Sequence, residues 1–323
     1  MQPIVIPRRR FLQQTTSCAA HLAIVAAISP AAVRALWAAE RAGAVVAQEP
    51  FGRLERIADG VWALVSTPLS GDRTTLANGG IVAGSNGVLA IEGFFQPAGA
   101  RWLATRAREL AGRWPTHVAL THYHADHANG VAGYRADGAT LAVHATEHTR
   151  DEALQRNRPE DADRTAALRD ALLLSPSASE TLDLGGRTVR FVPRAGHTAS
   201  DVTVEIEDPS IVFCGDLVWN AMFPNYVDTV PTKLSAAVRA LRRDRETIYV
   251  PGHGAVAGAA DITRYQAMLD EIEQAARDAH AAGISAAAAG AAYALPDTLG
   301  EWTLFSRTFF ERAFAAWYRE LDG

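Results

Sequence analysis

The densest group of potential metal ligands in this sequence lies in residues 121–127, which read THYHADH. Three imidazoles and one carboxylate fall within six residues: His122, His124, Asp126 and His127. Imidazole nitrogens and carboxylate oxygens suit zinc and chemically similar divalent ions. The mainly apolar residues 117–120 predict a short buried strand, and because side chains alternate along an extended chain, His122 and His124 should project to the same side. No core-packing requirement explains so many polar groups, so we interpret the segment as metal-binding rather than as a loop rich in histidine by chance.

Three further candidate ligands come directly after β-like runs. They are His197, Asp216 and His253, which follow the runs 188–193, 210–215 and 247–252. Loops at strand ends are where a rigid sheet can hold ligands in fixed geometry. A single histidine or aspartate in such a loop is usually an ordinary polar residue, but in this order and with the first segment the three predict one common site.

The order HxHxDH, GH, GD and PGHG across residues 121–254 resembles the metallo-β-lactamase superfamily. The likeness extends weakly upstream to about residue 54 and fades after about residue 260. It implies an α+β fold, a four-layer αββα sandwich, where the alternation of strands and helices alone indicates only a mixed α and β protein. It also implies ligand roles: His122, His124 and His197 for a first metal, Asp126, His127 and His253 for a second, and Asp216 as the bridge between them.

The resemblance implies a metal-dependent hydrolase with two divalent ions, with zinc expected and iron or manganese as alternatives. A shared water would lose a proton near neutral pH, and the metal-bridging hydroxide would attack a carbonyl or phosphoryl group. Asp126 would steer the hydroxide or pass a proton to the leaving group. We therefore expect an enzyme that cleaves a small ester, thioester, lactone or amide.

Two other activities stay open. β-Lactamases usually carry cysteine or a small polar residue where this chain has Asp216, which places strong β-lactam hydrolysis in doubt without excluding a weak activity. A mononuclear iron persulfide dioxygenase keeps many of the same residues. His124 argues against the flavodiiron oxidoreductases, which have glutamate there. A third alternative is a metal-binding protein without catalytic activity.

The N-terminus reads as a targeting segment. Residues 7–13, PRRRFLQ, resemble a twin-arginine export signal, and the modest apolar stretch 18–33 is too short and too weakly apolar for a comfortable transmembrane helix. We assign residues 1–47 to signal and linker and 48–323 to the hydrolase domain, with cleavage after Ala47 or earlier, near Ala35; an uncleaved anchor is the alternative. The twin-arginine export machinery is therefore an expected partner, the periplasm or the cell exterior is the expected location, and no stable membrane insertion is expected after processing.

Composition supports a globular domain with a small-molecule substrate. The chain has 323 residues and 48% hydrophobic residues, enough for a sizeable core. Residues 1–47 carry five arginines and one glutamate, so their removal takes the net charge from −5 to −9. An acidic body argues against nucleic acid as a partner, because polyanions require a basic surface.

Several residues near the motifs receive weaker interpretations. Cys214 is expected to be a buried, inert thiol. Thr121 and Thr198 could support ligands through hydrogen bonds. The histidines outside the motifs are read as surface or supporting groups: His21, His117, His144, His148 and His280. Side chains that could either grip an apolar acyl or aryl group or pack in the core are Phe94, Phe95, Trp219, Asn220, Phe223, Asn225 and Tyr226.

Periodicity and turn residues predict the elements that must position these side chains. Strands are expected at 54–65 (a hairpin), 78–84, 87–92, 117–121, 140–144 and within 181–216. Helices are expected at 97–112, 128–135, 146–173 (broken at 157–159), 232–243, 259–283 and 304–321.

Overall fold

The computed structural model describes residues 43–135, 141–156 and 161–323, all within one compact unit that spans residues 41–323. The predicted twin-arginine motif and the predicted helix break at 157–159 lie outside the described residues. Within the described ranges, no helix combines the length and the hydropathy needed to cross a bilayer.

The first sheet has eight strands in sequence order. Its strands are β1 (Ala44–Glu49), β2 (Gly52–Ala58), β3 (Val61–Ser66), β4 (Gly79–Ala83), β5 (Val88–Ile91), β6 (His117–Ala119), β7 (Ala142–Thr146) and β8 (Leu172–Leu174). Pairing is antiparallel from β1 to β5 and parallel from β5 to β8. The predicted hairpin is confirmed as β2 and β3, and its Asp-Gly turn places Gly60 at φ 65°, a left-handed conformation that favours glycine.

The second sheet has five strands in the order β13-β12-β11-β10-β9. Its strands are β9 (Glu180–Asp183), β10 (Thr188–Arg194), β11 (Asp201–Ile206), β12 (Ile211–Trp219) and β13 (Ile248–His253). β12 and β13 are parallel, and the chain crosses between them through helix α7 (Pro231–Leu241). Parallel neighbours place the ends of both strands at the same edge of the sheet, which matters for Asp216 and His253.

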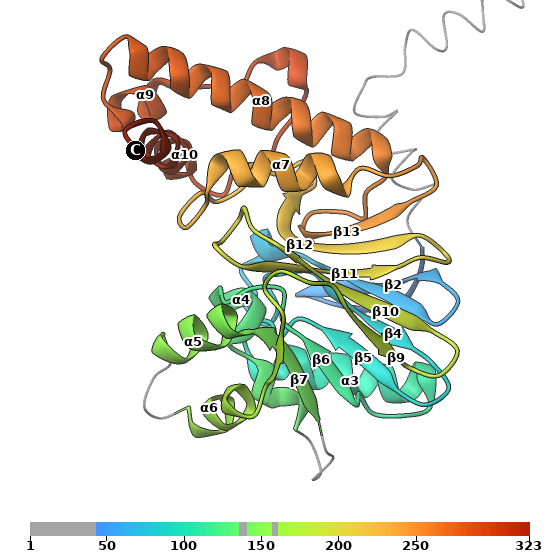
Figure 1. The fold of residues 1–323 in the computed structure, drawn as a ribbon. Helices are drawn as coiled ribbons and strands as arrows, with labels where there is room; N and C mark the ends of the chain where they lie inside the picture. The colour runs from blue at the N-terminus through green and yellow to red at the C-terminus, as the bar shows by residue number, and fades with distance from the viewer. Residues whose placement is uncertain (1–42, 136–140, 157–160) are drawn as a thin grey trace, which may run out of the picture. The chain divides into compact units, whose positions relative to one another are not determined.

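The two sheets pack face to face between two helical layers, as Figure 1 shows. The helices are α3 (Pro97–Ala111), α4 (Ala125–Ala128), α5 (Glu147–Gln155), α6 (Ala162–Arg169), α7, α8 (Ala259–Ala281), α9 (Ala286–Ala292) and α10 (Thr308–Leu321), with 3-10 turns η1 (Pro68–Ser70), η2 (Val131–Tyr134) and η4 (Asp297–Leu299). Three buried apolar clusters fill the three spaces between the layers. The middle cluster joins residues of both sheets, such as Val82 and Phe213. The expected αββα sandwich is confirmed.

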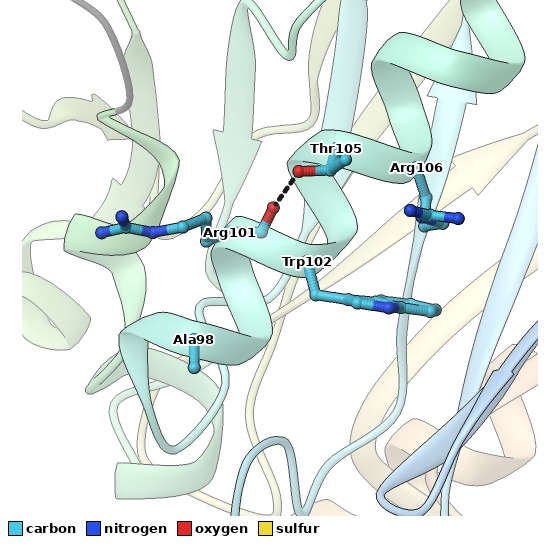
Figure 2. Close-up of a pocket in the computed structure, with 5 residues that line it drawn as sticks. All are labelled: Ala98, Arg101, Trp102, Thr105 and Arg106. Carbon is cyan, nitrogen blue, oxygen red and sulfur yellow. Dashed lines mark hydrogen bonds between the residues drawn. The ribbon is translucent and has the colours of Figure 1, made fainter.

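Helix α3 belongs to the layer outside the first sheet. It has Pro97 in its first turn and ends at Gly112, whose φ of 73° stops the helix in the left-handed conformation. Leu103 and three alanines face the core. The outer face carries a shallow hollow (Figure 2) lined by residues of this helix alone: Ala98, Arg101, Trp102, Thr105 and Arg106. None of them is a candidate metal ligand.

The predicted helix at 128–135 is wrong. The chain instead forms the single turn α4 and the 3-10 turn η2, separated by Asn129 and Gly130. A Cβ on Gly130 would collide with the backbone of Gln96, and one on Gly133 with the backbone of Pro97. The loop therefore packs directly on the start of α3, and this close backbone approach overrides local helix preference. Other differences are shifts of element ends, as at β7 and α10, whose predicted ranges began two and four residues too early.

Candidate metal centre

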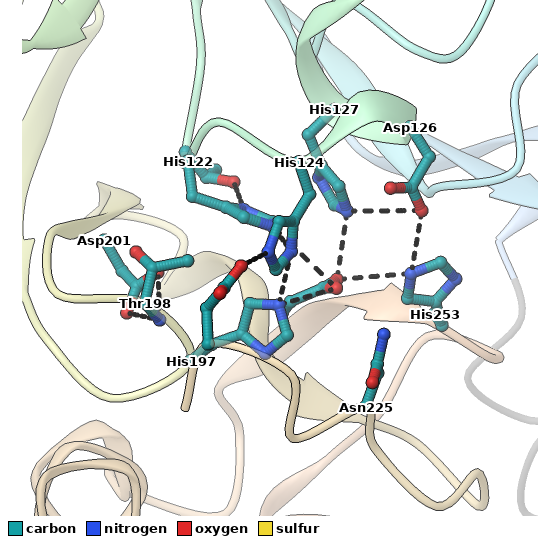
Figure 3. A network of polar contacts seen from close by, with 12 residues as sticks. His122, His124, Asp126, His127, His197, Thr198, Asp201, Asn225 and His253 are labelled. Atoms are coloured by element: carbon teal, nitrogen blue, oxygen red, sulfur yellow. Dashed lines mark hydrogen bonds and ion pairs between the residues drawn. The ribbon is translucent and has the colours of Figure 1, made fainter. Parts of the chain in front are cut away.

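All seven predicted ligands meet at one edge of the sandwich, where strands of both sheets end (Figure 3). His122 and His124 lie between β6 and α4, while Asp126 and His127 belong to α4. His197 lies between β10 and β11, and His253 is the last residue of β13. Asp216 differs from the sequence prediction, because it lies inside β12 rather than after a strand.

We call His122, His124, His197 and Asp216 the first cluster. His122 Nε2 and His197 Nε2 lie 3.1 and 2.9 Å from His124 Nδ1. Asp216 Oδ2 lies 3.3 Å from His197 Nε2 and 3.9 Å from His122 Nε2. Ligand atoms around a tetrahedral zinc ion with bonds near 2.0–2.1 Å lie roughly 3.3 Å apart. The first cluster therefore has the spacing of one metal site.

We call Asp126, His127 and His253 the second cluster. Asp126 Oδ2 lies 3.3 Å from His253 Nε2 and 3.8 Å from His127 Nε2. The other oxygen of Asp216, Oδ1, lies 3.1 Å from His127 Nε2 and 3.3 Å from His253 Nε2. The two Asp216 oxygens thus face different clusters, which is the geometry of a bridging carboxylate.

Six of the buried polar atoms that make no hydrogen bond in the described residues lie in this centre. They are both ring nitrogens of His127 and of His253, His197 Nδ1 and Asp216 Oδ1. Two of them, His127 Nε2 and His253 Nε2, lie at ion-pair distances of 3.1 and 3.3 Å from Asp216 Oδ1. Unsatisfied buried donors and acceptors are costly and rare in folded proteins. Divalent ions would satisfy the inward-facing atoms, so these residues fit the metals that the resemblance implies.

In the first cluster, burial dominates the protonation of the imidazoles. Desolvation lowers the pKa of His122 well below its usual value, and the neighbouring imidazoles add to the effect. Burial also lowers the pKa of His197 to about 3, although Asp216 opposes it. These rings are therefore neutral at physiological pH, which is the form that binds a metal.

In the second cluster, carboxylates outweigh burial. Burial would lower the pKa of His127, but Asp216, Glu92 and Asp126 raise it well above its usual value. Burial likewise opposes the charge of His253, yet Asp216 and Asp126 raise its pKa to about 9. Burial would raise the pKa of Asp126, and the two histidines instead lower it to about 2. Without metals, the second cluster is thus a set of buried ion pairs.

Comparison with known proteins agrees with the fold and the motifs. The profile of the metallo-β-lactamase superfamily matches residues 82–253, just over half of the chain. The chain belongs to the metallo-β-lactamase superfamily. It is a hydrolase of that superfamily, and the motif order read from the sequence is the order along the matched segment.

Hydroxyacylglutathione hydrolases are among the curated proteins to which this chain is similar. The protein of that name from Acidiphilium cryptum is 32% identical over 198 residues, which is 61% of this chain and 73% of the relative. Its namesake from Glaesserella parasuis is 30% identical over 106 residues, 33% of this chain and 37% of the relative.

Solved structures show the shared fold. A metallo-β-lactamase from Pontibacter korlensis superposes with a TM-score of 0.55 at 20% identity, covering 67% of this chain and 98% of that one. The inverting sec-alkylsulfatase Pisa1 from Pseudomonas sp. gives 0.65 at 15% identity, covering 87% of this chain and 50% of that one. At these identities the likeness concerns the fold alone.

Glu92 is a buried member of the centre that the sequence did not point out. It follows β5 with φ 75°, and its carboxylate accepts a hydrogen bond from the Thr121 hydroxyl at 2.6 Å and lies 3.1 Å from His127 Nδ1. The Thr121 hydroxyl also lies 3.0 Å from His122 Nδ1, as the prediction for Thr121 required. Thr121 therefore forms a hydrogen bond with the outward nitrogen of His122, and Glu92 lies at ion-pair distance from the outward nitrogen of His127. A single acidic residue ending an apolar run was the only signal in the sequence.

Asp228 is the second residue that sequence reasoning missed. Its Oδ2 lies 2.8 Å from His124 Nε2, the nitrogen that points away from the first cluster. Hydrogen bonds from His124 and Tyr123, with Arg156 nearby, hold the pKa of Asp228 well below its usual value despite partial burial. The ionised carboxylate accepts a hydrogen bond from the Nε2–H of His124, which keeps the proton on Nε2 and leaves Nδ1 free as a ligand.

Thr198 supports the ligands indirectly, without contacting a ligand ring. Its backbone N–H and hydroxyl both donate to Asp201, the hydroxyl at 2.8 Å. This closes the turn that carries His197, so the threonine shapes the loop and does not itself bind a ligand ring. Burial raises the pKa of Asp201 to about 7, although the Thr198 hydrogen bonds oppose the shift.

Two glycines make room for the bridging carboxylate. A Cβ on Gly252 would collide with Asp216 Oδ1. Gly215 has φ 53°, and a Cβ there would lie 2.7 Å from the Thr121 hydroxyl. The GD and PGHG motifs thus need glycine for steric reasons.

Most residues with weaker predictions belong to the packing of the domain. Phe94, Phe223 and Tyr226 are buried in the core, and Cys214 is buried with burial raising the pKa of its thiol. His144 is buried rather than on the surface: it stacks on Phe191, and its Nε2 lies 3.0 Å from His117 Nδ1, away from both clusters. His280 pairs with Asp322 on the surface, and the ring of the half-buried His148 packs edge-on to Tyr123.

The remaining pocket candidates divide in the same way. Asn220 donates to the carbonyl of Ala255 and supports a loop, whereas Asn225 points toward the cluster (Figure 3). Trp219 packs on His253, and half-buried Phe95 lies under the guanidinium of Arg73. Trp219 is buried in the core, whereas Asn225 is partly exposed beside the clusters.

Proposed function

We propose that this protein is an exported hydrolase that binds two zinc ions and cleaves a small ester, thioester, lactone or amide. The observation that carries the proposal is the orientation of Asp216, whose two oxygens face two separate ligand clusters. The curated relatives named hydroxyacylglutathione hydrolases support thioesters within this class. An aspartate bridge also supports the wider hydrolases over strong β-lactam hydrolysis.

Different residues of the chain have different roles in the proposed hydrolysis. When bound, the divalent ions would polarise the substrate oxygen and supply a hydroxide nucleophile near neutral pH. Asp228, Glu92 and Thr121 fix the ring orientation of three candidate ligands, so that the inward nitrogens stay in place during the reaction. Asp126, whose side chain is 25% exposed, lies at the open edge of the centre, where it can accept a proton from the attacking water and donate it to the leaving group.

Metal analysis and a substrate panel test this proposal together. Protein purified from its own host should contain about two zinc ions per chain, and the zinc-loaded protein should hydrolyse at least one chromogenic ester, thioester or lactone. His122→Ala should abolish the hydrolysis, whereas His280→Ala, a surface histidine on α8, should leave it unchanged. One iron per chain with oxidation of a persulfide would overturn the proposal in favour of the dioxygenase alternative.

Export through the twin-arginine route is part of the same proposal. The route carries folded proteins, so a metalloenzyme could acquire its ions before crossing the membrane. Strand β1 spans Ala44–Glu49 and pairs with β2, so a cut after Ala47 would divide a paired strand. A cut near Ala35 would keep it whole and is the site we favour. N-terminal sequencing of the mature protein tests this, and an uncut N-terminus would indicate the anchor alternative.

A further inference from the structure

Three aromatic rings lie side by side next to His253. The Trp219 ring packs 3.9 Å from the His253 ring, and the Phe305 ring lies 6.2 Å from it. Phe305 and Phe309 each contact Trp219 edge-on, at 5.9 and 6.2 Å, and lie 6.2 Å from each other. We call Trp219, Phe305 and Phe309 the aromatic wall. It gives the second cluster an apolar flank.

The backbone holds the wall against the centre. Phe223 N–H donates to the Thr303 carbonyl, and Thr303 N–H donates to the Ala221 carbonyl, both at 2.9 Å. These bonds attach the segment before α10 to the loop that follows β12. Phe305 is therefore positioned relative to Trp219 and Asp216 by a short, hydrogen-bonded path rather than by a free loop.

Arg312 fixes the outer end of the wall. Its guanidinium lies 5.4 Å from the Phe309 ring and donates to Asn225 Oδ1 at 2.9 Å. Asn225 points toward the metal cluster (Figure 3). The wall thus extends from the second cluster to a polar rim made by one amide and one guanidinium.

Within the wall, Trp219 belongs to the buried core of the C-terminal layer, and Phe305 and Phe309 pack against that core from outside. Helix α10 buries a full apolar face that includes Phe310, Phe314 and Trp317. Phe305 and Phe309, in contrast to these residues and to Trp219, are only half-buried. Two adjoining, partly open aromatic rings beside a candidate active centre fit a binding surface better than a packing role. Both residues also lie beyond the segment 82–253 that matches the superfamily.

We propose that the aromatic wall binds an apolar acyl group of the substrate and sets the substrate preference of this enzyme. The inference rests on the proposed hydrolase function and names its substrate class: esters or thioesters whose acyl part is an alkyl chain or an aryl group. A charged, peptide-like group would find no partners along the three rings, because burying polar groups without hydrogen bonds is costly. The acyl carbonyl would lie at the cluster while its apolar part lies along Phe305 and Phe309.

A chain-length series on the metal-loaded, full-length protein tests the proposal. We expect kcat/KM for p-nitrophenyl esters to rise from acetate to octanoate by about three- to fourfold for each methylene buried on the wall. Phe305→Ser and Phe309→Ser should flatten this slope while acetate hydrolysis stays within about threefold of the parent, since a two-carbon acyl group hardly reaches the wall. Phe305→Leu and Phe309→Leu keep an apolar side chain and should retain part of the slope.

A binding measurement and a control complete the experiment. Octanoate should bind the metal-loaded protein more tightly than butanoate in calorimetry, with a negative heat-capacity change, and the serine variants should lose the difference. Leu172→Ala on β8, a residue that is 53% exposed, should leave both slopes unchanged. Hydrolysis of the acetate ester without any chain-length dependence would overturn the proposed role of the aromatic wall but not the proposed hydrolase function. A slope that survives in the serine variants would overturn it equally, whereas no hydrolysis of any ester, thioester or lactone would count against the hydrolase itself.

Discussion

The two ligand clusters share Asp216 but differ in charge. The first contains His122 and His197, whose burial favours the neutral ring, and a neutral imidazole is the form that binds zinc. The second combines carboxylates with imidazoles whose pKa values are raised, so it holds protons when empty. A metal entering the first cluster displaces little, whereas a metal entering the second must displace protons from buried ion pairs. This difference predicts that the two clusters bind metal in a fixed order, the first cluster before the second.

Removing a ligand of the first cluster should have the largest effect. His122→Ala should lower kcat/KM by at least about 10³-fold, because the first cluster would no longer hold a metal ion that could polarise the substrate. Elemental analysis should show loss of metal in the same preparation. His280→Ala is the matched control, and activity that persists in His122→Ala would remove the first cluster from the mechanism.

Lowering the pH should empty the second cluster first. His253, with a pKa of about 9 in the metal-free centre, and His127, whose pKa is also raised, are protonated at neutral pH, and protonation competes with metal. Affinity at the second cluster should therefore fall by about tenfold for each displaced proton and each pH unit below 9. The first cluster should stay nearly constant over the same range. Chelator competition at pH 6, 7 and 8 measures both, and equal slopes would refute the charge difference.

Substituting a carboxylate that contacts the outward nitrogen of a ligand should have a smaller effect than removing the ligand, and the effect should fall mainly on one cluster. Asp228→Asn removes the carboxylate on His124, and Glu92→Gln removes the one on His127. Each should weaken its own metal by about 10- to 100-fold, with a smaller effect on the other. Stepwise zinc titration of the two variants reports this. A uniform loss of both metals in either variant would mean that the clusters do not act separately.

A histidine outside both clusters tests whether burial alone lowers an imidazole pKa here. Burial, aided by His117, lowers the pKa of His144 to about 4, so the folded state stays neutral while the unfolded state titrates near 6.5. Stability from this residue is therefore complete above pH 6.5 and is lost as the pH falls toward 4, by about 2 kcal/mol at pH 5. Urea unfolding of the parent and His144→Gln at pH 7.5 and 5.0 should show a smaller acid loss in the variant. Identical losses would assign the shift to other groups.

The sequence predicted the parts of the centre that depend on local spacing. The seven candidate ligands sit in short motifs that can be recognised in the linear sequence. The strands beside them have clear apolar runs. Glu92 and Asp228 could not be found this way, because their partners Thr121 and His124 lie 29 and 104 residues away. The helix predicted at 128–135 failed for a related reason, since the contact of Gly130 with Gln96 is set by tertiary packing.

The glycines beside Asp216 have a consequence for how such an enzyme can diversify. Gly252 and Gly215 leave no space for even one methyl group against the bridging carboxylate and Thr121. A mutation at either position would displace Asp216 or Thr121, which contact candidate ligands of both clusters, so the middle of the centre is closed to gradual change. New activities would have to arise at the rim instead, in segments such as the one that carries Phe305. Libraries for directed evolution of this protein should therefore keep positions 215 and 252 fixed and vary the residues around the entrance.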